Sequence, residues 1–191
     1  LDSNSPFVLQ SVATQNDSVV RQSRKFATYQ PGKSHYILLS CVINAQPGGN
    51  DSGVISRIGY FDQSNGVFFQ HNGDGGQGSM FVVLRTSGTG SIVNKAVAQQ
   101  NWNIDKMDGN GESGLLLDST KTLILFADME WLGVGRVRTG FIIGGKIIYV
   151  HEFHHSNIET IPYLSMPSLA TRFENVQKAN NVALCVSPRI G

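Results

Sequence analysis

Short apolar runs separated by glycine-rich turns restrict the fold of this chain more than any other feature. The clearest case is residues 123–156, where two β-branched runs flank Gly144-Gly145. Two glycines between apolar runs favour a two-residue hairpin turn of the primed type. Asn65-Gly66 gives the same signal earlier in the chain. The sequence therefore predicts antiparallel strands joined by tight hairpins.

Runs with the alternating or continuous apolar pattern of strands recur along the chain. They occupy residues 19–29, 35–44, 54–62, 67–71, 80–86, 91–99, 123–131, 136–143, 146–153, 169–177 and 182–186. Their regular spacing is typical of a sandwich or barrel. We predict an all-β, antiparallel β-sandwich that is jelly-roll-like and has about nine or ten strands, because two packed sheets hide strand edges well.

The length and composition of the chain favour one domain. The chain has 191 residues, of which 40% are hydrophobic, enough for a sizeable core. We expect an N-terminal arm at residues 1–20 and a single domain at 21–191. The formal net charge of +1 gives no electrostatic case for nucleic acid, and no run approaches the ~18 apolar residues that span a membrane. The first residues lack a signal-peptide pattern and an initiator Met, so we expect a fragment or a processed chain.

Both cysteines, Cys41 and Cys185, lie inside apolar runs. A free cysteine behaves as a small hydrophobic residue, so two buried thiols are the simpler interpretation. A disulfide between the two remains an alternative. Neither cysteine has a C-x-x-C neighbour, which argues against a cysteine metal site.

The string His151-Glu152-Phe153-His154-His155 has the form of a zinc-protease motif. That motif needs a helix, which places residues i and i+4 on one face. Here a β-branched run precedes it, and in a strand the two histidines would lie roughly 13 Å apart. We therefore reject His151, Glu152 and His155 as metal ligands and expect Tyr149, His151 and Phe153 to share one strand face. A weaker metal hypothesis places His154 and His155 at a symmetry axis.

Asp128 and Glu130 share a face of the predicted strand at 123–131. Paired carboxylates are typical of glycosidases, and the spacing does not exclude that chemistry. Arg136 and Arg138 follow on the next strand, however. Cross-strand ion pairs are the simpler interpretation, and we predict no catalytic residue and no cofactor.

A polar loop at residues 101–114 holds the candidate ligand-binding residues, Trp102, Asp105 and Asp108. Oxygen-rich loops can bind calcium, but the acidic spacing does not fit an EF-hand. A loop that uses Asp and Asn for its turns is the simpler interpretation. Trp102, in its polar surroundings, is the best candidate for an exposed residue that contacts a ligand, and an anchor that holds the loop in place is the alternative.

Several short motifs occur in a distinctive order along the sequence. They are Gln30-Pro31-Gly32-Lys33-Ser34, Arg57-x-Gly59-Tyr60-Phe61-Asp62, Asn65-Gly66-Val67-Phe68-Phe69, Trp102-Asn103-x-Asp105, Asp108-Gly109, Glu130-Trp131-Leu132-Gly133-Val134-Gly135-x-Val137-Arg138, His151-x-Phe153 and Arg172-Phe173-Glu174. Across residues 21–177 the chain resembles poorly characterised structural proteins of large double-stranded DNA viruses and tailed phages. The resemblance implies a virion component, such as a minor capsid, penton, fibre or tail-associated β domain.

Two functions follow as expectations. The first is a virion structural protein that assembles particles through subunit contacts, with other virion proteins as partners and a homo-oligomeric state. The alternative is a carbohydrate- or receptor-binding module on the virion surface, which would use the loops at residues 72–79 and 101–114. An enzyme is the poorest fit.

Overall fold

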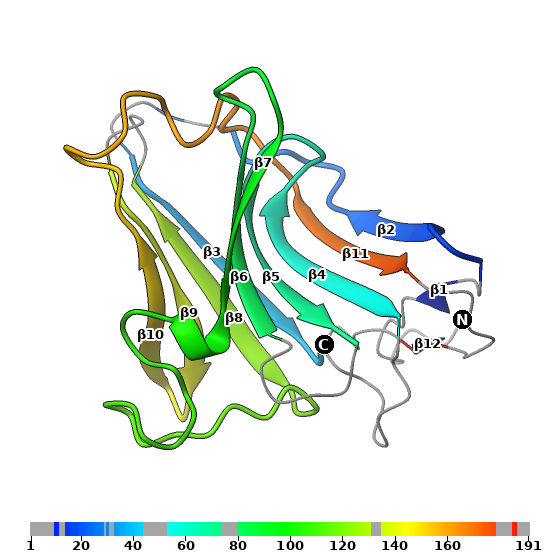
Figure 1. The fold of residues 1–191 in the computed structure, drawn as a ribbon, viewed down its shortest axis with the longest axis vertical. Coiled ribbons are helices and arrows are strands. Elements are labelled where there is room, and N and C mark those ends of the chain that lie inside the picture. The colour runs from blue at the N-terminus through cyan, green and yellow to red at the C-terminus, as the bar shows by residue number, and fades with distance from the viewer. Residues whose placement is uncertain are drawn as a thin grey trace.

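The computed structural model describes residues 10–11, 14–28, 30, 33–43, 53–73, 80–130, 135–178 and 185–186. These residues form two main antiparallel sheets (Figure 1), one with the order β2-β11-β4-β5-β6-β7 and one with the order β10-β9-β8-β3. β1 and β12 pair separately. The predicted antiparallel sandwich is confirmed, with ten strands in the two main sheets.

The observed strands follow the predicted runs from β3 to β11 closely, whereas β2 ends at Gln22 instead of residue 29 and β1 lies within the expected arm. Their bounds are β1 Gln10–Ser11, β2 Ser18–Gln22, β3 His35–Cys41, β4 Val54–Phe61, β5 Gly66–Asn72, β6 Met80–Thr86, β7 Val93–Ala98, β8 Leu123–Met129, β9 Val137–Ile143, β10 Lys146–Phe153, β11 Thr171–Gln177 and β12 Cys185–Val186. One 3-10 turn, η1, spans Gln99–Asn101.

The core lies between the two sheets and takes one face from each. Ile58, Tyr60 and Phe69 of the six-stranded sheet share a buried cluster with Leu125 and Phe141 of the four-stranded sheet. Burial of such apolar faces supplies most of the driving force for folding. Cys41 belongs to this cluster and is a free thiol, whereas the side chain of Cys185 lies outside the described part of the chain.

The two hairpin predictions are confirmed. β4 pairs with β5, and β9 pairs with β10. Gly144 and Gly145 have φ angles of 59° and 77°, as a turn of type I′ requires at both central residues. Gly66 has a φ of 133°, which favours glycine.

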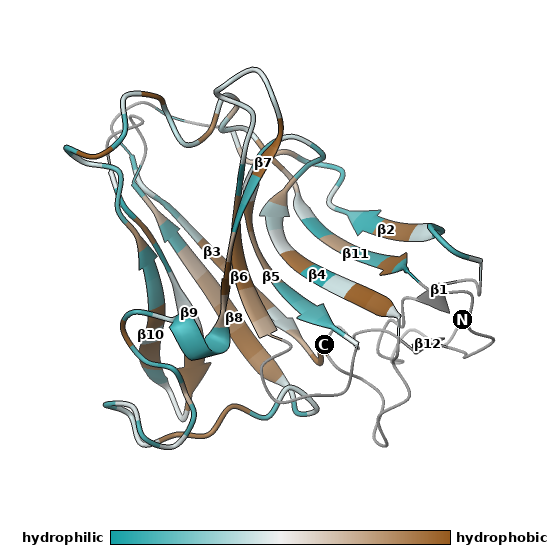
Figure 2. Ribbon diagram, viewed as in Figure 1, coloured by the Kyte–Doolittle hydropathy of each residue, from teal (hydrophilic) through white to brown (hydrophobic). Residues whose placement is uncertain are grey.

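Strands from the two ends of the chain lie side by side in the six-stranded sheet (Figure 1). β11 pairs on one side with β2 and on the other with β4. Residues 18–20, which we assigned to the N-terminal arm, are part of β2. Along β11 hydrophobic and hydrophilic residues alternate (Figure 2), so that Phe173 enters the core while Arg172 and Glu174 lie on the opposite face.

A β-bulge in β10 overturns one prediction. The register shifts between Tyr149 and His151, which leaves Val150 as an extra, fully buried residue. Tyr149 therefore does not share a face with His151 and Phe153, as the strict alternation predicted. Its ring instead meets Phe126 at 5.2 Å, edge to face. An extra residue in one strand reverses the facing of all residues on one side of it.

The ion pairs predicted across β8 and β9 are confirmed. Arg138 binds Asp128 at 2.5 Å, and Arg136 lies 3.5 Å from Glu130. Residues 131–134, between these two pairs in sequence, lie outside the described residues. Among the residues that the structure describes, no helix is long and apolar enough to cross a membrane.

Candidate ligand-binding face on the six-stranded sheet

The outer face of the six-stranded sheet carries rows of polar and aromatic side chains. The strand registers set Glu174, Arg57, Gln70 and Phe81 in one row across β11, β4, β5 and β6. The next row holds Arg172, Gly59, Phe68 and Val83, and the third holds Phe61, Gly66, Arg85 and Asn94. Alternation along each strand turns all of these away from the main core.

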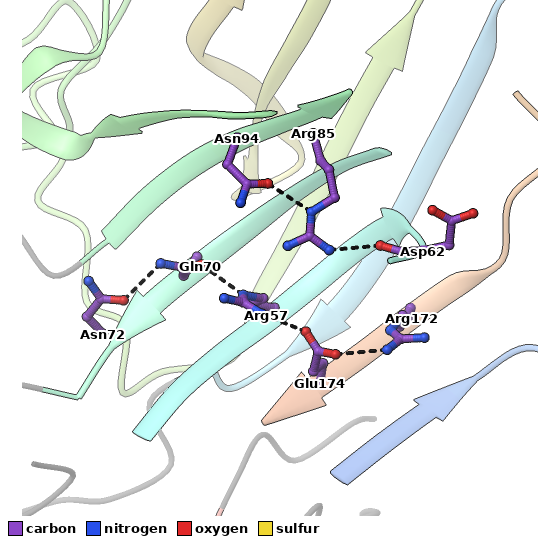
Figure 3. A network of polar contacts seen from close by, with 8 residues as sticks. All are labelled: Arg57, Asp62, Gln70, Asn72, Arg85, Asn94, Arg172 and Glu174. Carbon is purple, nitrogen blue, oxygen red and sulfur yellow. Dashed lines mark hydrogen bonds and ion pairs between the residues drawn. The ribbon is translucent and has the colours of Figure 1, made fainter. Parts of the chain in front are cut away.

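A continuous chain of hydrogen bonds crosses three strands of this face (Figure 3). Gln70 donates to Asn72 at 3.0 Å, and Arg57 donates from Nε to Gln70 at 2.9 Å. Glu174 accepts from Arg57 and from Arg172, each at 2.8 Å, through different carboxylate oxygens. Each side chain is thus held by a neighbour, and the orientation of the face is set before any ligand arrives.

Arg85 forms a second polar centre beside this chain of bonds. It donates from Nε to Asn94 at 2.8 Å and from Nη1 to the Asp62 carbonyl at 2.9 Å. Burial lowers the pKa of Arg85 from its ordinary value, and repulsion from Arg57 lowers it further. The guanidinium is therefore a cation in an environment that does not fully compensate its charge.

Two phenylalanine rings lie next to the guanidiniums. Phe61 and Phe68 pack with centroids 4.5 Å apart and form a small apolar cluster with Val83, separate from the main core. Arg85 lies 4.9 Å from the Phe68 centroid, within the range of a cation–π contact. The rings support the polar layer and hold its cations in place.

Gly59 makes this arrangement sterically feasible. A Cβ at this position would lie 2.3 Å from the Val67 carbonyl oxygen and 2.6 Å from the Phe68 Cβ. No side chain fits there without moving the backbone of β5. Glycine at the centre of β4 thus leaves room for the close approach of the neighbouring strand and its ring.

The face becomes more accessible toward β7. Phe61 and Phe68 are buried, and Arg85 is only 7% exposed. Phe81, Gln70 and Asn72 are partly exposed, and Asn94 and Ala96 on β7 are exposed. A ligand would therefore meet the partly exposed Phe81 ring and the amides first, with the guanidiniums behind them.

The prediction that Trp102 is exposed is wrong, whereas the alternative of a loop anchor agrees with its burial. Trp102 is 2% exposed, its Nε1 donates to the Val97 carbonyl, and its ring lies 6.2 Å from that of Phe141. Val97 belongs to β7 and Phe141 to β9, so the indole closes one side of the sandwich. The polar residues around it in the sequence point outward while the ring points inward. Its proposed ligand contact remains an untested prediction.

The two aspartates of the same loop shape its backbone. Asp105 is buried and accepts hydrogen bonds from the amides of Met107 and Ser113, each at 2.7 Å. Burial acts to raise the pKa of Asp105, but these bonds prevail and hold it below its ordinary value. Asp108 is exposed and caps the Asn110 amide. The structure does not bring Trp102, Asp105 and Asp108 together around a common ligand position in any contact that it describes.

The His-Glu string anchors that loop to the bulged strand. His151 accepts from the Asn103 amide at 3.3 Å, and Asn103 exchanges two bonds of 2.9 Å with the backbone of Glu152. The Val150 carbonyl accepts from the amides of Ile104 and Asp105. Burial lowers the pKa of His151 to about 4, so the ring is neutral and can accept. Within the described ranges no three His, Cys, Asp or Glu residues group as metal ligands do.

The residues of the polar face were not predicted as site residues from the sequence. Arg57, Gln70, Arg85, Arg172 and Glu174 are scattered over four runs that we interpreted only as strands. A signal was present, because polar residues at alternate positions of an otherwise apolar strand indicate a second, non-core face. The strand order, which brings β11 beside β4, is what gathers them.

Comparisons with known proteins find a likeness among solved structures. No protein-family model and no curated protein matches the chain. Among solved structures, the chain is similar to a legume lectin-like domain from Entamoeba histolytica, with 9% identity, a TM-score of 0.46, and coverage of 97% of this chain and 84% of that domain. At this TM-score the likeness carries no weight for the site or the ligand.

Proposed function

We propose that the chain is a carbohydrate-binding module that holds a glycan on the outer face of its six-stranded sheet. The observation that carries this proposal is the pre-arranged chain of planar side chains from Asn72 to Arg172. It lies beside Phe81, a partly exposed ring.

The chemistry of a sugar suits such a face. Each hydroxyl can donate and accept, and amide, guanidinium and carboxylate groups supply both functions. The C–H side of a sugar ring is apolar and packs on an aromatic ring, as binding sites with a few placed polar groups on an apolar floor allow. Phe81, Gln70 and Asn94 provide these elements at the accessible end of the face.

Binding to a glycan array, followed by calorimetry with the best binder, tests the proposal. Asn94→Ala removes an exposed amide whose oxygen accepts from Arg85, and we expect at least a tenfold loss of affinity. Thr122→Ala, at an exposed position just before β8 of the other sheet, is the control and should bind as the unmodified chain does. Binding unaffected by Asn94→Ala and Phe81→Ala would contradict this placement.

A second candidate function is particle assembly through subunit contacts, and the outer face of the four-stranded sheet favours it. Four large apolar residues there are 41–51% exposed, namely Tyr36, Leu38, Ile124 and Ile147. Exposed apolar surface of this kind is typical of interaction sites. The Asp128–Arg138 pair on the same face is self-complementary, because a two-fold related copy would place its arginine beside this aspartate. We propose a second copy as the occupant.

Light scattering after size-exclusion chromatography tests this second candidate. We expect a concentration-dependent dimer that Leu38→Glu converts to monomer. Ile158→Glu, at a site that is 67% exposed elsewhere, serves as the control and should leave the dimer intact. A monomer at all concentrations would rule the contact out.

A further inference from the structure

We infer that the glycan bound by the six-stranded sheet carries an acidic group, a carboxylate or a sulfate ester, and that Arg85 receives it. The inference rests on the proposed glycan-binding function and specifies its ligand class. It follows from the charges of the polar face, their hydrogen-bond partners and their exposure.

Positive charge exceeds negative charge on this face. The face carries three guanidiniums, those of Arg57, Arg85 and Arg172, and the carboxylate of Glu174 forms ion pairs with only two of them, Arg57 and Arg172. Arg85 has no ion pair within the described part of the chain; both of its hydrogen bonds go to neutral oxygens. The Asp62 carboxylate nearby, whose Oδ1 accepts from the amides of Ser64 and Asn65, adds a second negative charge, so the three cations still exceed the anions by one.

The burial of these cations makes the imbalance significant. Arg85 and Arg172 are 7% and 9% exposed, so water screens their repulsion poorly. The Nε of Arg172 is also buried without an acceptor among the described residues. A bound anion would stabilise this face, because it would offset the excess positive charge and accept hydrogen bonds from the guanidinium donors.

The geometry favours an oxoanion rather than a neutral hydroxyl at this position. A guanidinium presents its donors in a planar fork that fits two oxygens of a carboxylate or sulfate. Arg85 uses Nε and Nη1 within the protein, which leaves donors of the remaining amino group for a ligand. The adjacent Phe81 and Gln70 then contact the sugar that carries the acid.

The test compares matched acidic and neutral glycans by calorimetry. The probes are a sulfated lactose with lactose, and sialyllactose with its methyl ester, so that each acidic sugar has a neutral counterpart, with inorganic sulfate and a short single-stranded oligonucleotide alongside. We expect at least tenfold tighter binding of one or both acidic sugars than of the neutral counterpart, and which one distinguishes carboxylate from sulfate. Affinity should fall as salt is raised.

Two variants at Arg85 isolate its role. Arg85→Gln removes the charge and should abolish the preference for the acidic probe, so that the variant binds the acidic sugars no more tightly than their neutral counterparts. Arg85→Lys keeps the charge without the fork and should restore part of the preference. Circular dichroism and thermal unfolding confirm that each variant folds, and Thr122→Ala again serves as the control.

The outcomes separate the inference from the proposed function. Equal binding of the acidic sugars and their neutral counterparts would overturn the inference and leave the glycan-binding function standing. Binding of no glycan would overturn both. Binding of inorganic sulfate alone, or of the oligonucleotide as tightly as the acidic sugars, would overturn the inference by removing the sugar from the recognition.

Discussion

Gly59 determines how closely β4 and β5 pack on the outer face of the six-stranded sheet. The missing side chain lets β5 approach until any Cβ would collide with Val67 and Phe68. The rings of Phe61 and Phe68 then pack 4.5 Å apart and support Arg85. At this scale the face is a set of close contacts that a methyl group would break.

Gly59→Ala is therefore expected to lower the free energy of unfolding by about 3 kcal/mol, the upper part of the range for overpacking. Gly144→Ala is the matched comparison, because a Cβ there meets no atom within 4 Å and only its positive φ costs about 1–2 kcal/mol. Chemical denaturation measures both. Gly59→Ala should also lose glycan binding, which Gly144→Ala should keep; equal effects on stability and binding would refute the steric account.

His151 makes the stability of the protein depend on pH. Its folded-state pKa of about 4, lowered by burial and then by His154, lies below the ordinary value near 6.5. The unfolded chain therefore takes up the proton first as the pH falls. Stability should be constant above about pH 6.5 and decline by about 3 kcal/mol as the pH falls to about 4.

Urea unfolding at a series of pH values measures this decline. His151→Gln keeps an acceptor for the Asn103 amide and should flatten the curve between pH 6.5 and 4. Burial also lowers the pKa of His155, so a smaller slope should remain in the variant. An unchanged slope in His151→Gln would assign the pH dependence to other groups.

At the scale of elements, the loop at residues 99–118 and the bulge in β10 depend on each other. The bulge turns the Val150 carbonyl toward the amides of Ile104 and Asp105. Asn103 pairs with the backbone of Glu152 much as another strand would. The loop thereby covers the outer edge of the four-stranded sheet and protects backbone groups that would otherwise attract another chain.

Trp102→Ala should destabilise the protein by about 3–5 kcal/mol, as loss of a large buried ring does. The indole bridges β7 and β9, so its loss should also loosen the covered edge. Ile104→Ala, at an exposed position of the same loop, should change stability by less than about 0.5 kcal/mol. Thermal unfolding compares the two; similar values would contradict the anchoring role.

The elements were predictable where local signals decide them, and the candidate site was not. Apolar runs and the turns at Gly66 and Gly144 predicted the strands from β3 to β11 to within about three residues at each end, but missed β1 and overextended β2. The bulge at Val150 leaves no mark in an alternating pattern, because one extra residue is indistinguishable from ordinary β sequence. The burial of Trp102 depends on Phe141, about forty positions away in the sequence, and the sequence around it is polar.

At the scale of the molecule, one cooperative core spans both main sheets. Cys41 lies within it, fully buried, and burial raises the pKa of its thiol to about 12. A thiol of this kind is neither ionised nor reachable in the folded state. Its reactivity should therefore report on opening of the whole structure rather than on local motion.

Thiol labelling of a Cys185→Ser variant tests this expectation. Cys41 should label only at the rate at which the protein unfolds, and the rate should rise steeply with denaturant. Leu116→Cys, introduced at a position that is 61% exposed, should label at once. If Cys41 reacts as fast as that control, the core opens locally near β3.

The place of β11 in the six-stranded sheet has a consequence for biosynthesis. Arg57 and Glu174, partners in the polar face, are 117 positions apart in the chain. At ~5–20 residues per second of translation, roughly 6–23 s separate the two. During that interval the edge of β4 that β11 later covers has no partner from β11, and the face lacks Arg172 and Glu174. The polar face is consequently completed late in synthesis, and the nascent chain carries an exposed strand edge until β11 emerges.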